Sequence, residues 1–105
     1  MGMNELQQVQ DWYDSQCNQD WEHSYGVKID TLDNPGWSLE VDLLETELAG
    51  RNFESFSRGD CEEDSDWICC RVEQEKFKGS GGAKNLTELL QVFLAWAASA
   101  PSNSL

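Results

Sequence analysis

Hydrophobic and polar residues alternate along residues 27–43, and this alternation organises the rest of the chain. The apolar positions are Val27 and Ile29 on the first side, then Trp37, Leu39, Val41 and Leu43 on the second. Successive side chains of a strand point to opposite faces, so a period of two predicts strands over 27–32 and 37–43. One face of this pair would be apolar and the other acidic.

The four residues Asp33-Asn34-Pro35-Gly36 between the two strands are typical of a tight turn. Pro35 presets φ at the second turn position, and Gly36 accepts the positive φ that a type II turn requires next. We therefore expect an antiparallel hairpin whose apolar face another part of the chain must cover.

Two segments near the ends of the chain have the three- and four-residue spacing of amphipathic helices. The first covers residues 4–17, with Asn4 as N-cap and with a stripe formed by Leu6, Val9, Tyr13 and Cys17. The second starts at Asn85, with Glu88 as capping-box partner, and its broad stripe is Leu86, Leu89, Leu90, Phe93 and Ala97. These helices are predicted to cover the hairpin.

The middle of the chain has weaker patterns. Short strands are suggested by Thr46, Leu48, Phe53 and Phe56, and residues 57–66 are predicted to form a polar loop. Strand character returns at 67–72, and residues 73–78 either continue that strand or turn back after Gln74. The Gly-Ser-Gly-Gly run at 79–82 is predicted to be a flexible connector.

The order of these segments predicts the fold class. It is α+β: an antiparallel sheet of about four to five strands, framed by an N-terminal and a C-terminal helix packed on one face. Residues 1–98 would form a single domain, and residues 99–105 a flexible C-terminal tail.

Charge narrows the function classes. The chain has 105 residues, with 20 acidic against 7 basic side chains and a net charge of −13. Nucleic-acid binders need Lys and Arg to displace counterions from phosphate, so direct nucleic-acid binding is excluded as a general function, and anionic membranes are disfavoured. A basic protein partner, or solubility alone, accounts for the charge.

The cysteines predict a reducing environment. Cys17, Cys61, Cys69 and Cys70 include no C-x-x-C pair, and one histidine cannot complete a zinc set. No secretory signal precedes Asn4 and no apolar run has the length of a membrane span. We expect a cytoplasmic protein with free thiols and no cofactor.

Three groups of residues have the composition of a reactive or metal site. His23 with Glu22 and Asp20 suggests acid/base chemistry, but no partner nucleophile is identifiable, and a structural histidine at a helix–strand junction is the better explanation. Asp30, Glu40 and Asp42 can share one face of the hairpin, either as ligands for Mg²⁺ or Ca²⁺ or as a solvated strand face. The run from Gly79 to Lys84 lacks the spacing of a phosphate loop, which leaves a plain linker.

The acidic loop is the strongest candidate for binding. Its carboxylates are Asp60, Glu62, Glu63, Asp64 and Asp66. Gly59 precedes the acids, so the spacing of an EF-hand calcium loop is not met. The loop is either mobile and solvated or a docking surface for Lys and Arg.

A distinctive motif consists of Trp21, Glu22, His23, Tyr25 and Gly26, followed by Asp33, Asn34, Pro35, Gly36 and Trp37. This motif resembles the immunity protein 53 family of bacterial polymorphic-toxin systems. Trp12-Tyr13, Trp67, the stretch 77–82 and the helix 86–96 are also similar, so the likeness covers about residues 6–97.

This resemblance implies a small cytosolic antidote that binds and blocks a cognate toxin domain, with no catalysis. A basic toxin surface, such as the groove of a nuclease, would suit an acidic antidote. We assign toxin contacts first to Asp60, Glu62, Glu63, Asp64 and Asp66, and second to Glu40 and Asp42. The alternatives are a small metal-binding or hydrolytic domain using His23 and nearby carboxylates, and an interaction module without a toxin.

Overall fold

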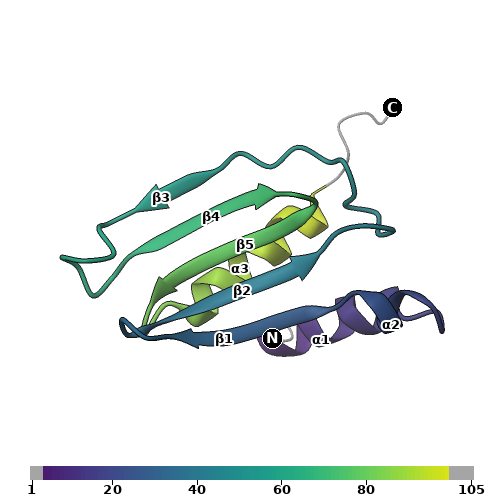
Figure 1. The fold of residues 1–105 in the computed structure, drawn as a ribbon, viewed down its shortest axis with the longest axis horizontal. Coiled ribbons are helices and arrows are strands. Elements are labelled where there is room, and N and C mark those ends of the chain that lie inside the picture. The colour runs from purple at the N-terminus through teal and green to yellow at the C-terminus, as the bar shows by residue number, and fades with distance from the viewer. Residues whose placement is uncertain (1–3, 100–105) are drawn as a thin grey trace.

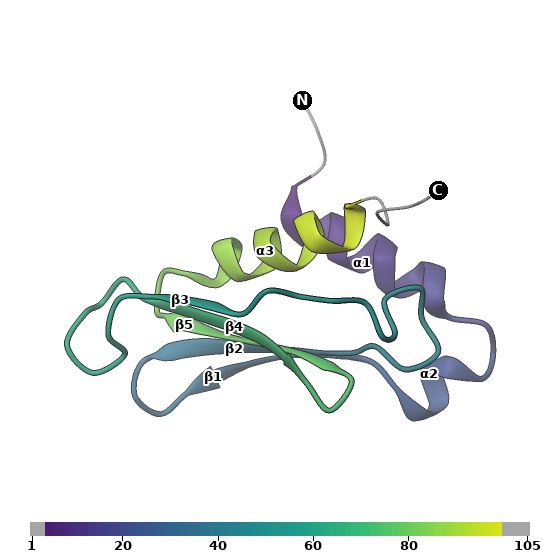
Figure 2. The ribbon, with the colours of Figure 1, turned by 90° about the horizontal axis from the view of Figure 1, so that it is seen from above.

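The computed structural model describes residues 4–99 as a five-stranded antiparallel sheet with helices on one face (Figures 1 and 2). The strands are β1 (Val27–Leu32), β2 (Gly36–Asp42), β3 (Phe56–Arg58), β4 (Ile68–Glu73) and β5 (Lys76–Gly82). The helices are α1 (Glu5–Gln16), α2 (Trp21–Ser24) and α3 (Leu86–Ala98). Strand order is β1-β2-β5-β4-β3, so the predicted α+β class is confirmed.

The predicted hairpin forms, but its turn differs from the prediction. β1 and β2 pair from Val27 with Val41 to Leu32 with Gly36. Gly36 does not have a positive φ; among the described glycines only Gly50 and Gly59 do. A glycine is required there for another reason, because a Cβ on Gly36 would lie 2.4 Å from the carbonyl oxygen of Gly81 in the neighbouring strand.

The glycine-rich run at 79–82 is the end of the central strand, so the predictions of a flexible connector and a plain linker were wrong. β5 pairs with β2 on one side and with β4 on the other. A Cβ on Gly79 would lie 3.0 Å from Leu89 Cδ2, and one on Gly82 would lie 2.1 Å from the carbonyl oxygen of Ser65. The missing side chains let α3 and the chain before β4 approach the strand closely.

The segment between β2 and β4 is less regular than the sequence suggests. Residues 44–55 contain turns and no strand, and β3 begins only at Phe56. The polar loop was predicted to start at residue 57 but starts at residue 59, because Ser57 and Arg58 pair with β4. After β4 the chain turns back at Gln74 and Glu75, which have positive φ values of 54° and 60°, and this decides the alternative left open for 73–78.

The helix ends confirm one predicted cap and correct another. Asn4 Oδ1 accepts a 2.8 Å hydrogen bond from the backbone N–H of Gln7, as an N-cap does. Asn85 precedes α3 without capping it, since its φ of −107° and ψ of 12° are not extended. Its amide Nδ2 donates instead to Asp66 Oδ1 at 2.9 Å and to Glu88 Oε1 at 3.1 Å. The predicted capping box therefore does not form.

Two smaller features lie at the ends of these helices. The short helix α2 was not predicted; Asn18 Oδ1 starts it by accepting a 2.8 Å hydrogen bond from the N–H of Trp21. Of the tail predicted at 99–105, only Ser99 is among the described residues, and its N–H closes α3 on the carbonyl of Trp96 at 3.1 Å. Residues 100–105 lie outside them.

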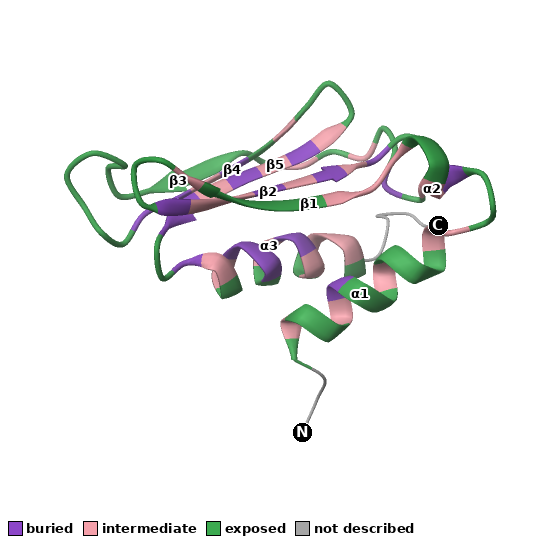
Figure 3. Cartoon of the chain, turned by 60° about the horizontal axis from the view of Figure 1, so that its bottom comes forward, coloured by how far each residue is buried: buried purple, intermediate pink, exposed green. Residues whose placement is uncertain are grey.

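The core lies between the sheet and α1 and α3, so the predicted cover of the hairpin is confirmed (Figures 2 and 3). Its buried members are Val9, Leu39, Val41, Leu43, Leu48, Ile68, Cys70, Phe77, Leu89, Leu90 and Phe93. Phe93 contacts the rings of Phe77 and Trp12, at centroid distances of 5.4 and 5.1 Å. No helix within residues 4–99 has the length and apolarity that crossing a membrane requires.

Candidate binding surface

The acidic loop, residues 59–66, joins β3 to β4 and is exposed along its whole length. Its own carboxylates shape its backbone. Asp64 Oδ2 accepts from the N–H of Asp60, and Asp60 Oδ1 accepts from the N–H of Glu62, both at 2.8 Å. Each of these carboxylates has a second oxygen that the turn does not use, so the loop is ordered and still presents negative charge.

Asp66 differs from the other acids of the loop because Arg58 holds it. Arg58 bridges Asp66, at 2.5 Å, and Glu88 at the start of α3. Hydrogen bonds from the Asn85 amide and from Arg58 lower the pKa of Asp66, and Arg58 lowers the pKa of Glu88. This cluster fastens one end of the loop to the helix, which gives Asp66 a structural role beside any contact with a partner.

Four carboxylates of the loop remain without a basic neighbour. They are Asp60, Glu62, Glu63 and Asp64. Within residues 4–99, no Lys or Arg nitrogen lies within ion-pair distance of them. Their negative charge is therefore available to a basic partner.

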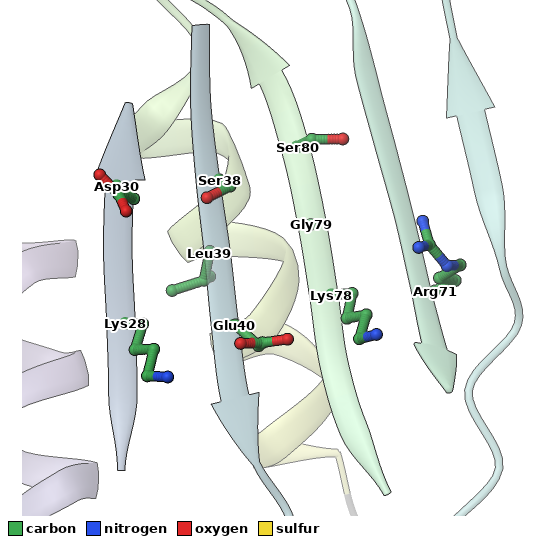
Figure 4. A pocket seen from close by; sticks show the side chains of 9 residues that line it. All are labelled: Lys28, Asp30, Ser38, Leu39, Glu40, Arg71, Lys78, Gly79 and Ser80. Carbon is green, nitrogen blue, oxygen red and sulfur yellow. The ribbon is translucent and has the colours of Figure 1, made fainter. Parts of the chain in front are cut away.

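The open face of the sheet carries the second group of candidates (Figure 4). Strand register places Lys28, Glu40, Lys78 and Arg71 in one row across β1, β2, β5 and β4. They line a shallow pocket of about 260 Å³ together with Asp30, Ser38 and Ser80. The hairpin face expected to be acidic thus shares its surface with basic side chains from β4 and β5.

Ion pairs within this face neutralise some of its charged side chains. Asp42 Oδ1 lies 2.5 Å from Lys76 Nζ, and Asp42 Oδ2 accepts from the N–H of Gly26 at 2.9 Å. The Asp42 side chain is only 17% exposed. Glu73 pairs with Arg71 at 2.9 Å and with Lys78 at 3.9 Å. Of the two second-rank candidates, Glu40 forms no ion pair within residues 4–99, whereas Asp42 is held internally.

A family described as immunity protein 53 matches residues 6–98. The chain belongs to the immunity protein 53 family. No curated protein and no solved structure matched it. The family name identifies an immunity protein, and it implies a non-enzymatic role and the binding of a cognate toxin.

The aromatic part of the motif in this immunity protein packs the junction before β1. Trp21 is buried, and its indole N–H donates to the carbonyl of Leu44 at 2.9 Å. Its ring contacts Trp12 and Tyr25, with centroids 6.2 and 6.1 Å away. Glu22 accepts from the backbone N–H groups of 18 and 19, and backbone hydrogen bonds lower its pKa. Trp21 and Glu22 therefore have structural roles, because both side chains are hydrogen-bonded to the backbone of the fold.

The turn part of the motif ties three segments together. Asn34 Nδ2 donates to the carbonyl of Cys61 at 3.3 Å, which links the β1–β2 turn to the acidic loop. Trp37 Nε1 donates to the carbonyl of Ala83 at 2.9 Å, just before α3. Asp33 and Pro35 are exposed at the turn, whereas Gly36 is buried in the sheet.

His23 is exposed in the short helix α2. Its backbone N–H donates to the carbonyl of Asp20 at 3.1 Å. The neighbouring Glu22 carboxylate is committed to two backbone amides, so it does not orient the imidazole. In the part of the chain that the structure describes, no three His, Cys, Asp or Glu side chains are grouped to hold a metal ion.

The exposure of two large apolar side chains on α1 was not predicted from the sequence. The helical stripe of α1 was expected to be buried, yet Leu6 is 61% and Tyr13 is 37% exposed. Val9 and Trp12 contact the core instead, since the large ring of Trp12 packs against Phe93. The spacing of Val9, Trp12 and Gln16 is also helical, and Trp12 was the signal that could have selected this face.

Proposed function

We propose that this immunity protein binds its cognate toxin domain in the cytoplasm of the producing bacterium and neutralises it by covering the toxin's active site with an acidic surface. The observation that supports this most strongly is a set of four loop carboxylates, Asp60, Glu62, Glu63 and Asp64, which have no basic neighbour among residues 4–99. They lie in a chain with a net charge of −13.

Charge complementarity supplies the mechanism. A toxin that acts on nucleic acid has a basic groove for phosphate, and a row of carboxylates can occupy such a groove in place of the substrate. Opposite charges also accelerate association by a factor of about 10 to 1,000, which suits an antidote that must act before damage accumulates. Glu40 on the open face is a second contact, and Asp42 contributes mainly by holding Lys76.

Growth rescue is the direct test. The product of the adjacent upstream gene is tested as the toxin: it is expressed in a sensitive bacterium with and without the immunity protein, and the purified pair is analysed by size-exclusion chromatography. We expect restored growth and co-elution at a defined ratio. A toxin that kills equally in both strains, with no complex at micromolar concentration, would remove the proposal. The Arg58→Ala variant removes the ion pairs that fasten the loop to α3. Its affinity for the toxin shows whether ordering of the loop contributes to binding.

A further inference from the structure

β1 has a free edge. Sheet order ends at this strand, so one side of Val27–Leu32 has no strand partner among the described residues (Figure 1). The N–H of Asp42 donates to the carbonyl of Gly26 at 3.0 Å, and this sets the phase of the ladder. Pairs alternate in an antiparallel ladder, so Val27, Ile29 and Thr31 direct their N–H and C=O groups outward.

The outward N–H groups of this edge differ in availability. Asp30 Oδ1 accepts a 2.9 Å hydrogen bond from the N–H of Thr31, which confirms that this amide faces away from β2 and leaves Val27 and Ile29 to donate to an added strand. The six residues of β1 include no proline and no interruption of their pairing with β2. Natural edges are normally protected by charged side chains, proline, bulges, brevity or a covering element. Of these, β1 has the charged pair Lys28 and Asp30 but neither proline nor bulge, so a strand of complementary charge can still pair with it.

An apolar groove runs beside the free edge on the helix side of the sheet. It measures about 330 Å³ and is lined by Leu6, Val9, Gln10, Tyr13 and Val27. Ile29, on the same side of β1, is 38% exposed. Figure 3 shows most of α1 as exposed. A strand added to β1 would place every second side chain at this groove.

Charge decides what kind of strand fits. Residues 4–27 include five acidic side chains and no Lys or Arg. β1 itself carries only Lys28 and Asp30. A second copy of this chain would bring another net charge of −13 to the edge and be repelled. A basic strand would be attracted instead.

We propose that β1 is a strand-addition site for the toxin. An extended segment of the toxin domain, with alternating apolar and basic side chains, pairs with Val27–Leu32 and packs its apolar side chains beside Leu6 and Tyr13. This inference rests on the proposed function. The β1–β2 turn contacts the acidic loop through Asn34 and Cys61, so one toxin domain can reach both the edge and the loop.

Two pairs of variants test this site by calorimetry with the purified toxin domain. Ile29→Pro removes an outward N–H and leaves the bonds to β2 intact, whereas Ile29→Ala keeps the N–H. We expect Ile29→Pro to weaken binding by about 10- to 100-fold, as an unmade buried hydrogen bond does, and to weaken it more than Ile29→Ala. Leu6→Ala should also weaken binding. Its matched control, Phe56→Ala on the opposite edge of the sheet, should not.

Amide hydrogen exchange on the unmodified protein tests the same site without any variant. Toxin binding should slow exchange at the outward amides of Val27 and Ile29 by at least about tenfold, as it does for a newly paired strand. The amides of β3 at the other edge should be unchanged. This measurement decides the matter if circular dichroism shows that Ile29→Pro does not fold.

The outcomes are distinguishable. If the unmodified protein binds and rescues growth, while Ile29→Pro and Leu6→Ala bind equally well or the amides of β1 stay unprotected, strand addition is overturned and the proposed function stands. If sedimentation shows a dimer without toxin that Ile29→Pro dissociates, the edge belongs to a second copy and the inference fails. If no toxin binding and no rescue occur, both proposals fall.

Discussion

The side-chain amide of Asn34 donates a hydrogen bond of 3.3 Å to the carbonyl oxygen of Cys61. This bond joins the turn after β1 to the acidic loop before β4, across 27 residues of sequence. It places the Leu32 end of β1 beside the acidic loop. The motif residue Asn34 therefore has a structural role, because it holds the acidic loop against the β1–β2 turn.

Neutralising the loop should slow capture of the toxin. In a variant with Asp60→Asn, Glu62→Gln, Glu63→Gln and Asp64→Asn, the loop keeps hydrogen-bond acceptors where Asp60 and Asp64 shape its backbone. We expect the association rate constant to fall about tenfold or more at low salt and its dependence on ionic strength to flatten, because electrostatic steering is lost. Stopped-flow fluorescence at two salt concentrations measures both effects.

The control changes the same number of charges elsewhere. Asp20→Asn, Glu45→Gln, Glu54→Gln and Glu75→Gln neutralise four exposed acids outside the loop. If this control slows association as much as the loop variant does, net charge rather than the loop steers the toxin.

A side chain at Gly82 should destabilise the fold. The Cβ of Gly82→Ala would lie 2.1 Å from the carbonyl oxygen of Ser65 and 2.8 Å from Asn85 Oδ1, and neither backbone nor buried amide can move away freely. We expect a loss of about 1–3 kcal/mol or more in the free energy of unfolding, measured by urea denaturation.

Gly26→Ala is the matched control for that change. Nothing lies within 4 Å of a Cβ there, and its φ is not positive. Its free energy of unfolding should stay within about 0.5 kcal/mol of the unmodified value. Equal stability of the two variants would show that β5 and the segment before β4 are not packed as described.

The cluster around Arg58 should contribute to stability at neutral pH and less in acid. Arg58 lowers the pKa of Glu88 from its ordinary value of 4.5. A carboxyl group whose pKa is lower in the folded state stabilises that state above its unfolded pKa, and this stabilisation is lost as the pH falls through the folded pKa. Glu88→Gln should therefore be less stable than the unmodified protein at pH 7, with the difference shrinking below pH 4.5.

Urea titrations at several pH values measure this difference. The comparison between variants is the useful quantity, because acid also relieves repulsion among the other carboxylates of the chain. A difference that stays constant from neutral to acidic pH would mean that the Arg58–Glu88 pair does not form in solution.

The thiols should differ sharply in reactivity. Burial raises the pKa of Cys70 to about 12, whereas Cys61 is exposed in the acidic loop. The thiolate is the reactive form, so an aromatic disulfide reagent at pH 8 should label Cys61 and leave Cys70 unmodified until the protein unfolds. Mass spectrometry after digestion identifies the labelled residue. Rapid labelling of Cys70 in the folded protein would contradict its burial under α3.

The hairpin and the two long helices could be predicted because their signals are local. A strand needs only alternation, as at 27–32, and a helix only a three- to four-residue period and a cap such as Asn4. The acidic loop was equally visible, since consecutive carboxylates with no apolar period cannot be buried. Fold class, acidic character and family resemblance were therefore all available from the order of the residues.

The structure was needed wherever a residue's role depends on a distant neighbour. Gly79 and Gly82 have the composition of a linker, and only their pairing with Leu39 and Gly36 of β2 makes them part of the central strand. Strand order brings Lys76 and Lys78 to the face of the hairpin, which no local pattern encodes.

The candidate binding surface also has features that the sequence alone determines and features that depend on the tertiary structure. The sequence determined by itself that the protein is an acidic α+β domain with a run of loop carboxylates. The tertiary structure alone decided that Arg58 holds Asp66, while the other four loop carboxylates form no ion pair in the described part of the chain. It also decided that Leu6 and Tyr13 lie exposed beside β1. The physical reason is that charge and periodicity are properties of neighbouring residues, whereas pairing, burial and a free edge depend on which distant segments pack together.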